Sequence, residues 1–202
     1  MIASLIFSIM ISGFAAIYTT AFSQGGAVTR DSRLRTSAMI AFKGMNLMLV
    51  GATRLDQPGL NSSGNVLRGC RNFSPDGVRH TLLVPVDSFA YCVQPGGIGG
   101  CGTVAAPAPC LFSYRWNGCP APAVSAGNCG ANISGAVPDM LSPRVLYPAL
   151  PATQNHFIRL NSQAAGNQIH IQFVFQRDAT GKIPTLRYEI NTVAHTQVDG
   201  RL

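Results

Sequence analysis

A chain of 202 residues has room for one domain of ordinary size, or for a membrane anchor followed by one domain of about 150 residues. Only 11% of the residues are charged, and the 21 glycines and 13 prolines are unusual for a cytosolic enzyme but common in surface proteins. The formal net charge of +7 comes from scattered basic residues, without the Lys/Arg runs and interleaved aromatic residues that grip single-stranded nucleic acid. Weak binding to nucleic acid or to another anionic surface remains a minor hypothesis.

The first 22 residues contain no charged residue and no proline. As a helix they would span about 33 Å, which is enough to cross a hydrocarbon core of about 30 Å. We therefore predict a helix of membrane length at the N-terminus. The alternatives are a cleavable secretory signal with a small-residue site at 21–23 and the buried core helix of a soluble protein. The absence of a basic residue before Arg30 argues against the signal.

Small residues recur on one face of this predicted helix. Serines follow each other at a spacing of four, and alanines and threonines continue the stripe over the next turns. Such stripes let two helices approach closely, so the pattern predicts packing against copies of the same chain, with a lone anchor as the alternative. The residues predicted to take part in helix packing are Ser4, Ser8, Ser12, Gly13 and Ala16.

Basic residues follow the apolar run, at Arg30, Arg33, Arg35 and Lys43. The positive-inside rule would place this side of the membrane in the cytoplasm, whereas the cysteines further along favour an oxidising compartment. Both observations are satisfied if a basic leader originally preceded Met1 and was removed after insertion. We therefore expect the head to be extracytoplasmic.

Beyond the apolar run, the helix is predicted to continue as an amphipathic helix. Apolar residues recur there at roughly helical spacing, at Leu34, Ala38, Ala41, Met45, Met48 and Leu49. Gly25 and Gly26 lie between the two parts, and each costs about 1 kcal/mol of helix stability relative to alanine. We predict a helix break there, with a plain juxtamembrane linker as the alternative. The predicted division is a helical segment over 1–54 and a globular head over 55–202.

Two stretches together resemble the N-terminal helix of type IV pilins and related pseudopilins. They are MIASLIFSIMISGFAAIYTTAF, with Gly13 inside the apolar run, and its continuation VTRDSRLRTSAMIAFKGMNLMLV. The resemblance covers about residues 1–53. It implies a processed N-terminus, residence in the inner membrane before assembly, and N-terminal helices packed in the core of a filament. The family has a glutamate five residues into the mature chain, and this sequence has Leu5 at that place.

The head is predicted to contain antiparallel strands. Residues 78–93 have the β-branched and aromatic content of one or two strands, with Pro85 at an edge or a bulge. Alternation of apolar and polar residues within 167–195 predicts a hairpin with a turn near 178–182. One face of this hairpin should be buried, and its residues are Ile169, Ile171, Phe173, Phe175, Leu186, Tyr188 and Ile190. The predicted class is α+β, a long N-terminal hydrophobic helix followed by a small antiparallel-sheet head with disulfide-stapled loops.

Six cysteines lie within one stretch of 60 residues, at Cys70, Cys92, Cys101, Cys110, Cys119 and Cys129. Their closest spacing is nine residues, whereas zinc knuckles place two ligands within a tight turn. The segment is also poor in large apolar residues. We therefore predict three intramolecular disulfides, with no pairing assigned. The stretch over 95–151, rich in Gly, Pro and Ala, is predicted to be loops cross-linked by these bridges.

No motif in the chain nominates a catalytic, cofactor or metal site, and we do not expect an enzyme. The four histidines are widely separated, the eight carboxylates are not paired, and the glycines at 96–100 lack the Lys-Ser/Thr of a phosphate loop. Tyr114, Arg115 and Trp116 are a candidate exposed contact site, and the alternative is that Trp116 anchors a small core under the disulfides.

These observations lead to two main expectations about function. The first is a structural subunit of an extracellular type IV pilus-like filament at the cell surface. The second is a monomeric, membrane-anchored binding or adhesion domain outside the cytoplasm. A secreted hydrolase with an unrecognised site is a third possibility, for which the sequence nominates no residue.

Overall fold

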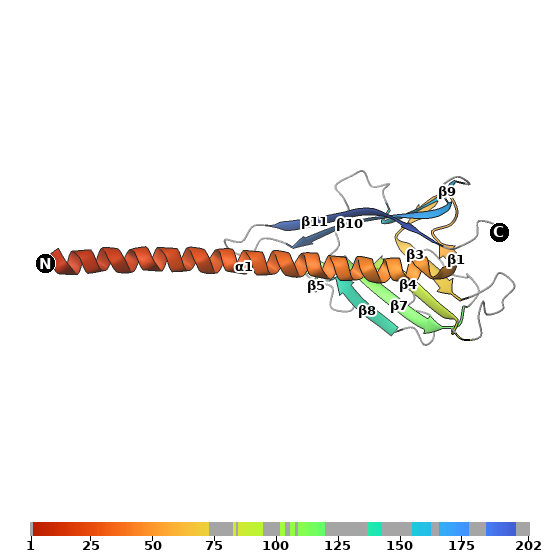
Figure 1. Cartoon of the computed structure of the whole chain (residues 1–202), viewed down its shortest axis with the longest axis horizontal. Coiled ribbons are helices and arrows are strands. Elements are labelled where there is room, and N and C mark those ends of the chain that lie inside the picture. Colours follow the sequence, from red (N-terminus) through yellow and green to blue (C-terminus); the bar gives the residue numbers. More distant parts are fainter. Residues whose placement is uncertain are drawn as a thin grey trace.

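The computed structural model describes residues 2–72, 83, 85–94, 102–103, 106–107, 109–119, 137–142, 155–162, 166–177 and 185–196. A single long helix, α1 (Ile2–Val50), runs along the molecule, and two antiparallel sheets lie beside its C-terminal half (Figure 1). The predicted α+β class is confirmed. Predictions that fall on the turn at 178–182, the glycines at 96–100 and residues 78–82 lie outside the described residues.

The first sheet has five strands in the order β1-β3-β4-β7-β8, and all its neighbouring strands are antiparallel. Its strands are β1 (Ala52–Gln57), β3 (Val66–Arg71), β4 (Asp87–Gln94), β7 (Cys110–Asn117) and β8 (Val137–Ser142). A separate two-stranded ribbon pairs β5 (Gly102–Thr103) with β6 (Ala106–Pro107).

The second sheet has four antiparallel strands in the order β11-β10-β9-β2. They are β11 (Leu186–His195), β10 (Gly166–Arg177), β9 (Phe157–Ser162) and β2 (Ser62–Gly64). The predicted hairpin is confirmed, because β10 and β11 pair in continuous register from Gln168 opposite His195 to Arg177 opposite Leu186. Its predicted inner face is also confirmed, with Ile169, Ile171, Phe173 and Phe175 fully buried.

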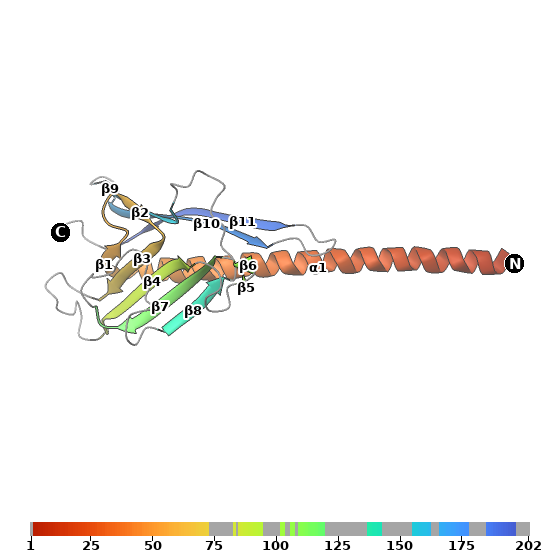
Figure 2. The ribbon, with the colours of Figure 1, turned by 180° about the vertical axis from the view of Figure 1, so that it is seen from behind.

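The C-terminal half of α1 fills the space between the two sheets. It contacts β11 and β10 of the second sheet and β8 of the first, and Figures 1 and 2 show it enclosed by them from opposite sides. Its inward positions form the main core together with large apolar residues of both sheets. The helix residues buried there are the six that the sequence pattern predicted, Leu34, Ala38, Ala41, Met45, Met48 and Leu49.

The helix ends at Val50, and residues 52–57 leave it to form edge strand β1. The sequence analysis placed the boundary between the helical segment and the head at residue 54, a few residues beyond the observed helix end. In the structure the side chains of Ala52 and Leu55 are buried by a strand with register shifts on either side of Arg54 and Leu55. Bulges of this kind let residues three apart share one face, which mimics helical spacing.

The helix continues through Gly25 and Gly26, so the predicted break is not found. Two glycines reduce helix stability by about 2 kcal/mol in total relative to alanine, but long helical segments on both sides supply the hydrogen-bonded turns that carry the helix across them. The hydroxyl of Thr29 also donates to the carbonyl oxygen of Gly25 at 2.9 Å.

The loop prediction for 95–151 misses four strands, the short β5 and β6 and the longer β7 and β8. β7 lies between β4 and β8 within the first sheet, and its residues 110–114 are buried. A second, smaller core on the face of the sheet away from α1 contains Val66, Ala90, Cys92, Cys110, Phe112, Tyr114 and Trp116. The signal for β7 is the alternating aromatic run CLFSYRWN, which its Gly- and Pro-rich surroundings obscured.

Candidate functional site

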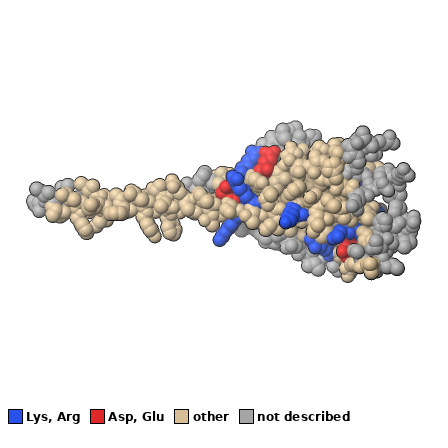
Figure 3. Space-filling model, viewed as in Figure 1, with Lys and Arg blue, Asp and Glu red and all other residues tan. Residues whose placement is uncertain are grey.

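The N-terminal half of α1 projects beyond the head and has no apolar partner in the described chain. Figure 3 shows this arm as uncharged over the whole visible face up to the head. By length and composition the helix qualifies as a candidate membrane span from Ile6 onward. Large apolar side chains on it are more than half exposed, and they are Ile6, Phe7, Ile9, Met10, Ile11, Phe14, Ile17, Tyr18, Phe22 and Val28. Surface of this kind requires lipid or another protein to cover it.

The hydroxyl groups on the projecting arm donate to carbonyl oxygens of their own helix. Ser8 Oγ donates to Ser4 O at 3.0 Å, and Ser12 Oγ donates to Ile9 O at 2.9 Å. Thr19 and Thr20 bond back to the preceding turn in the same way. A bonded hydroxyl is far less costly to remove from water than a free one. These residues therefore do not prevent the arm from entering an apolar environment.

The small residues predicted to pack between helices are all exposed. Ser4, Ser8, Ser12 and Ala16 follow one another along the arm at a spacing of four, and a Cβ added at Gly13 would meet no atom within 4 Å. The described part of the chain thus leaves the whole stripe available for contact with another helix. The structure of a single chain does not bring these residues against a partner.

Basic residues gather on α1 where the arm meets the head, as Figure 3 shows. Arg35 makes an i,i+4 ion pair with Asp31 at 2.9 Å, and its Cζ lies 5.8 Å from the centre of the Tyr188 ring on β11. The Tyr188 hydroxyl in turn donates to Met39 Sδ at 3.6 Å. The end of the hairpin is thereby fastened to the helix at the boundary between apolar arm and head.

The disulfide prediction is confirmed for the cysteines that the structure describes. Cys70 at the end of β3 is bonded to Cys119 after β7, which ties two strands of one sheet across β4. Cys92 and Cys110 are also disulfide-bonded, and no described cysteine is free. Cys101 and Cys129 lie outside the described residues.

Two of the three residues predicted as a contact site are buried. Tyr114 and Trp116 are 5% and 6% exposed and belong to the smaller core, whereas Arg115 points to the opposite face of β7 and is exposed. Alternation along a strand makes it impossible for the three to form one surface. The prediction of an exposed aromatic contact site is therefore corrected. Trp116 is a core residue, and Cζ of Arg68 lies 5.3 Å from the centre of its ring.

A buried charged cluster, which sequence reasoning missed, lies at β1 of the first sheet and includes Arg159 from β9 of the second sheet. Asp56 accepts hydrogen bonds from Nε and Nη2 of Arg54 at 2.8 and 3.1 Å, and Nε of Arg68 is 3.8 Å from the same carboxylate. Arg159 donates to Leu55 O at 3.0 Å. Burial lowers the pKa of both Arg68 and Arg159, and the charge of Asp56 opposes this shift.

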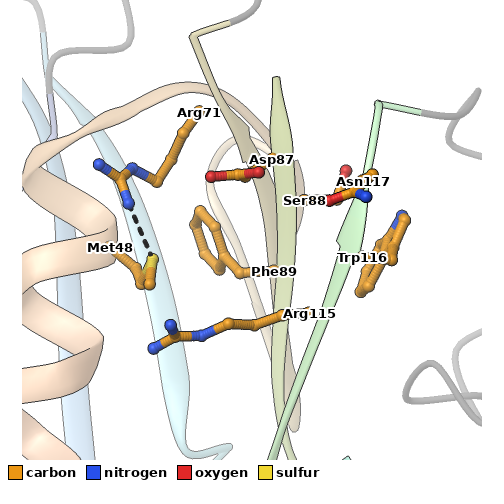
Figure 4. Close-up of a pocket in the computed structure, with 8 residues that line it drawn as sticks. All are labelled: Met48, Arg71, Asp87, Ser88, Phe89, Arg115, Trp116 and Asn117. Atoms are coloured by element: carbon orange, nitrogen blue, oxygen red, sulfur yellow. Dashed lines mark hydrogen bonds between the residues drawn. The ribbon is translucent and has the colours of Figure 1, made fainter. Parts of the chain in front are cut away.

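A polar pocket of about 380 Å³ opens beside the C-terminal end of α1 (Figure 4). Three of its residues lie side by side across three strands, Arg71 on β3, Asp87 on β4 and Asn117 on β7. Arg115 shares their face of the sheet, because it lies two residues before Asn117 on β7. Burial raises the pKa of Tyr91, and Arg115 opposes that shift. The remaining lining residues are Met48, Ser88, Phe89 and Trp116.

Among the described residues, no group of three or more His, Cys, Asp and Glu side chains could hold a metal ion. No protein-family model matches the chain, and no curated protein or solved structure matches it either. The exposed arm and the polar pocket are the features of this chain that bear on its function.

Proposed function

We propose that the chain is a structural subunit of an extracellular filament of the type IV pilus kind. In this proposal the N-terminal helices pack together in the filament core and the heads face solvent. The observation that carries the proposal is the projecting half of α1, on which ten of the described large apolar side chains are more than half exposed. The head encloses only the other half of the same helix.

Covering the apolar side chains of the arm would release a large free energy. Burying one large apolar side chain contributes about 1.5–3 kcal/mol, so ten of them represent a driving force on the order of 20 kcal/mol before the cost of association. Lipid can supply this burial for a single chain, and neighbouring helices can supply it in a filament. The small-residue stripe favours neighbouring helices, because close helix contact needs small side chains whereas lipid contact does not.

The proposed pathway begins in the membrane. The apolar run before Arg30 exceeds the roughly 20 residues needed to cross a bilayer, so it would hold the subunit in the inner membrane before assembly. The Cys70–Cys119 disulfide favours a head on the oxidising side of that membrane. The unbroken helix would then carry each head a fixed distance away from the packed arms.

Electron microscopy of producing cells tests the proposal. Deletion of the gene for this chain should remove the filaments or remove this subunit from them, and labelled antibody against the head should decorate filaments along their length. Unchanged filaments with unchanged subunit composition in the deletion strain would refute the proposal.

A monomeric, membrane-anchored binding domain is the second candidate, and the polar pocket favours it. The same arm would then serve only as an anchor, and a ligand would bind beside the end of α1. Extraction with a mild detergent separates the candidates. An anchor should be extracted as single copies whatever the expression level, whereas a filament subunit should form sedimentable polymers once assembled.

A further inference from the structure

The pocket beside the end of α1 contains charged groups whose hydrogen-bonding capacity the fold does not use. Within the described chain, the buried Nε of Arg71 donates to no acceptor, and Nη1 of the same residue reaches only the thioether sulfur of Met48, at 3.5 Å. A thioether is a weak acceptor. The Asp87 carboxylate makes no hydrogen bond or ion pair with any described side chain. Two residues of opposite charge, Arg71 and Asp87, therefore line the same cavity without pairing with each other.

The arrangement of these groups is set by the sheet and by the helix. Arg71 and Asp87 are register partners on β3 and β4, so their side chains stand next to each other on the face toward α1. Figure 4 shows the end of the Met48 side chain of α1 between the guanidinium groups of Arg71 and Arg115, with the Phe89 ring beside them. Arg115 and Asn117 are exposed, which leaves this side of the pocket accessible from solvent.

A ligand with a single charge fits this arrangement poorly. A plain anion near Arg71 would also lie near the carboxylate of Asp87, and a plain cation near Asp87 would lie near two guanidinium groups. A ligand that carries both charges satisfies both residues, because its anionic group accepts from guanidinium N–H groups while its ammonium group donates to the carboxylate. Charge-assisted hydrogen bonds of this kind are the strongest that side chains make.

We propose that this pocket binds a small zwitterion of the α-amino acid class. The carboxylate of the ligand binds Arg71, with Arg115 as a second donor, and its ammonium group binds Asp87. Phe89 and Met48 form an apolar wall for the ligand's side chain. The volume of about 380 Å³ lies within the range of about 300–1,000 Å³ that is typical of small-molecule sites. This proposal is independent of the filament role of the arm.

Gly51 is a positioning residue for this site. A Cβ at position 51 would lie 2.9 Å from Nε of Arg71 and 3.4 Å from its Nη2. The guanidinium group therefore occupies space that any other side chain at 51 would take. Because the obstructed atoms are the far end of a flexible side chain, Gly51→Ala should move the guanidinium group without unfolding the head.

Isothermal titration calorimetry on the full chain in a mild detergent tests the proposal. The probes are the twenty standard amino acids one at a time, with acetate and methylammonium as ligands of a single charge. At least one amino acid should bind, and each single-charge probe should bind about tenfold or more weakly than that amino acid. Absence of binding by every amino acid would overturn the proposal.

Variants of the charged residues separate a zwitterion site from an anion site. Arg71→Gln and Asp87→Asn should each weaken amino acid binding by about tenfold to a hundredfold. Asp87→Asn should strengthen binding if the true ligand is a plain anion, so unchanged or tighter binding by this variant overturns the proposal. Arg187→Gln is the matched control, because Arg187 is exposed on β11 beside Glu189 and outside the pocket.

The positioning role of Gly51 is measured with the same titration and an unfolding curve. Gly51→Ala should weaken amino acid binding while its urea midpoint remains close to that of the parent chain. Unchanged affinity in a folded Gly51→Ala variant would count against placement of the ligand carboxylate at Arg71.

Discussion

Nε of Arg68 lies 3.8 Å from Oδ2 of Asp56, and both side chains are about 5% exposed or less. The same carboxylate accepts two hydrogen bonds from Arg54, and its charge also acts on the buried Arg159. Arg159 belongs to β9 of the second sheet and bonds to the backbone of β1 in the first. Asp56 is therefore the shared counter-charge at a junction between the two sheets.

Asp56→Asn should destabilise the head by about 3–5 kcal/mol, because it leaves three arginine side chains without their nearby negative charge. Urea unfolding of the full chain in a mild detergent measures this change. Asp31→Asn is the matched control, since Asp31 pairs with the exposed Arg35 and should lose no more than about 1 kcal/mol. If the two variants lose equal amounts of unfolding free energy, Asp56 contributes no more to stability than a carboxylate in a surface ion pair.

Removal of the Cys70–Cys119 bridge should also destabilise the head. The two cysteines are 49 residues apart, and the chain-entropy relation gives about 4 kcal/mol for a loop of this length. A Cys70→Ser, Cys119→Ser double variant removes this bridge and leaves the other cysteines in place. Its urea midpoint should fall well below that of the parent, and coincident unfolding curves would contradict the expectation.

The stability of the head should fall on mild acidification because of His156. The His156 ring is 1% exposed and stacks on Phe173 at 5.0 Å, and burial lowers its pKa below the usual 6.5, although a hydrogen bond with the Gln172 carbonyl opposes the shift. Above pH 6.5 both the folded and the unfolded chain hold a neutral ring. Below that pH the unfolded chain takes up a proton first, so the free energy of unfolding decreases with a slope approaching about 1.4 kcal/mol per pH unit.

Urea unfolding between pH 7.5 and pH 5 measures this slope. The His156→Phe variant keeps a flat ring against Phe173 but cannot be protonated, so its curve should lose this part of the pH dependence even where its stability at neutral pH is lower. A variant whose pH dependence equals that of the parent would exclude His156 as the source.

Local patterns account for the parts of the fold that could be predicted from the sequence. The buried face of α1 from Leu34 to Leu49 follows from a helical repeat of apolar residues, and the β10–β11 hairpin follows from strict alternation within one continuous stretch. In both cases the partners that matter are close in sequence. Physical rules of periodicity are sufficient there.

Long-range pairing explains what could not be predicted. β7 pairs with β4 and β8 across intervening segments, and no local pattern specifies which strands become neighbours. The Asp56 cluster joins β1 to Arg159, which is about a hundred residues further along the chain. Likewise the pocket at Arg71 and Asp87 depends on strand register. A list of charged residues in sequence order contains none of this information.

The last prediction concerns the small-residue stripe on the arm. Ser8→Leu adds bulk to a face on which Ser8 now bonds only to Ser4 of its own helix, so membrane insertion should be unaffected. Helices that pack through this face would be forced apart, because close contacts favour small residues. Filament yield should therefore fall sharply while the amount of chain in the membrane fraction stays near normal.

Ala21→Leu is the matched control for Ser8→Leu. Ala21 is also exposed on the arm, but at 3.6 residues per turn it lies roughly 140° around the helix from Ser8. The same increase in bulk at this position should leave filament yield much less affected. If Ser8→Leu cells make normal filaments, the serine stripe is not the packing surface. If both variants lose filaments equally, the arm packs on all sides and the stripe has no special role.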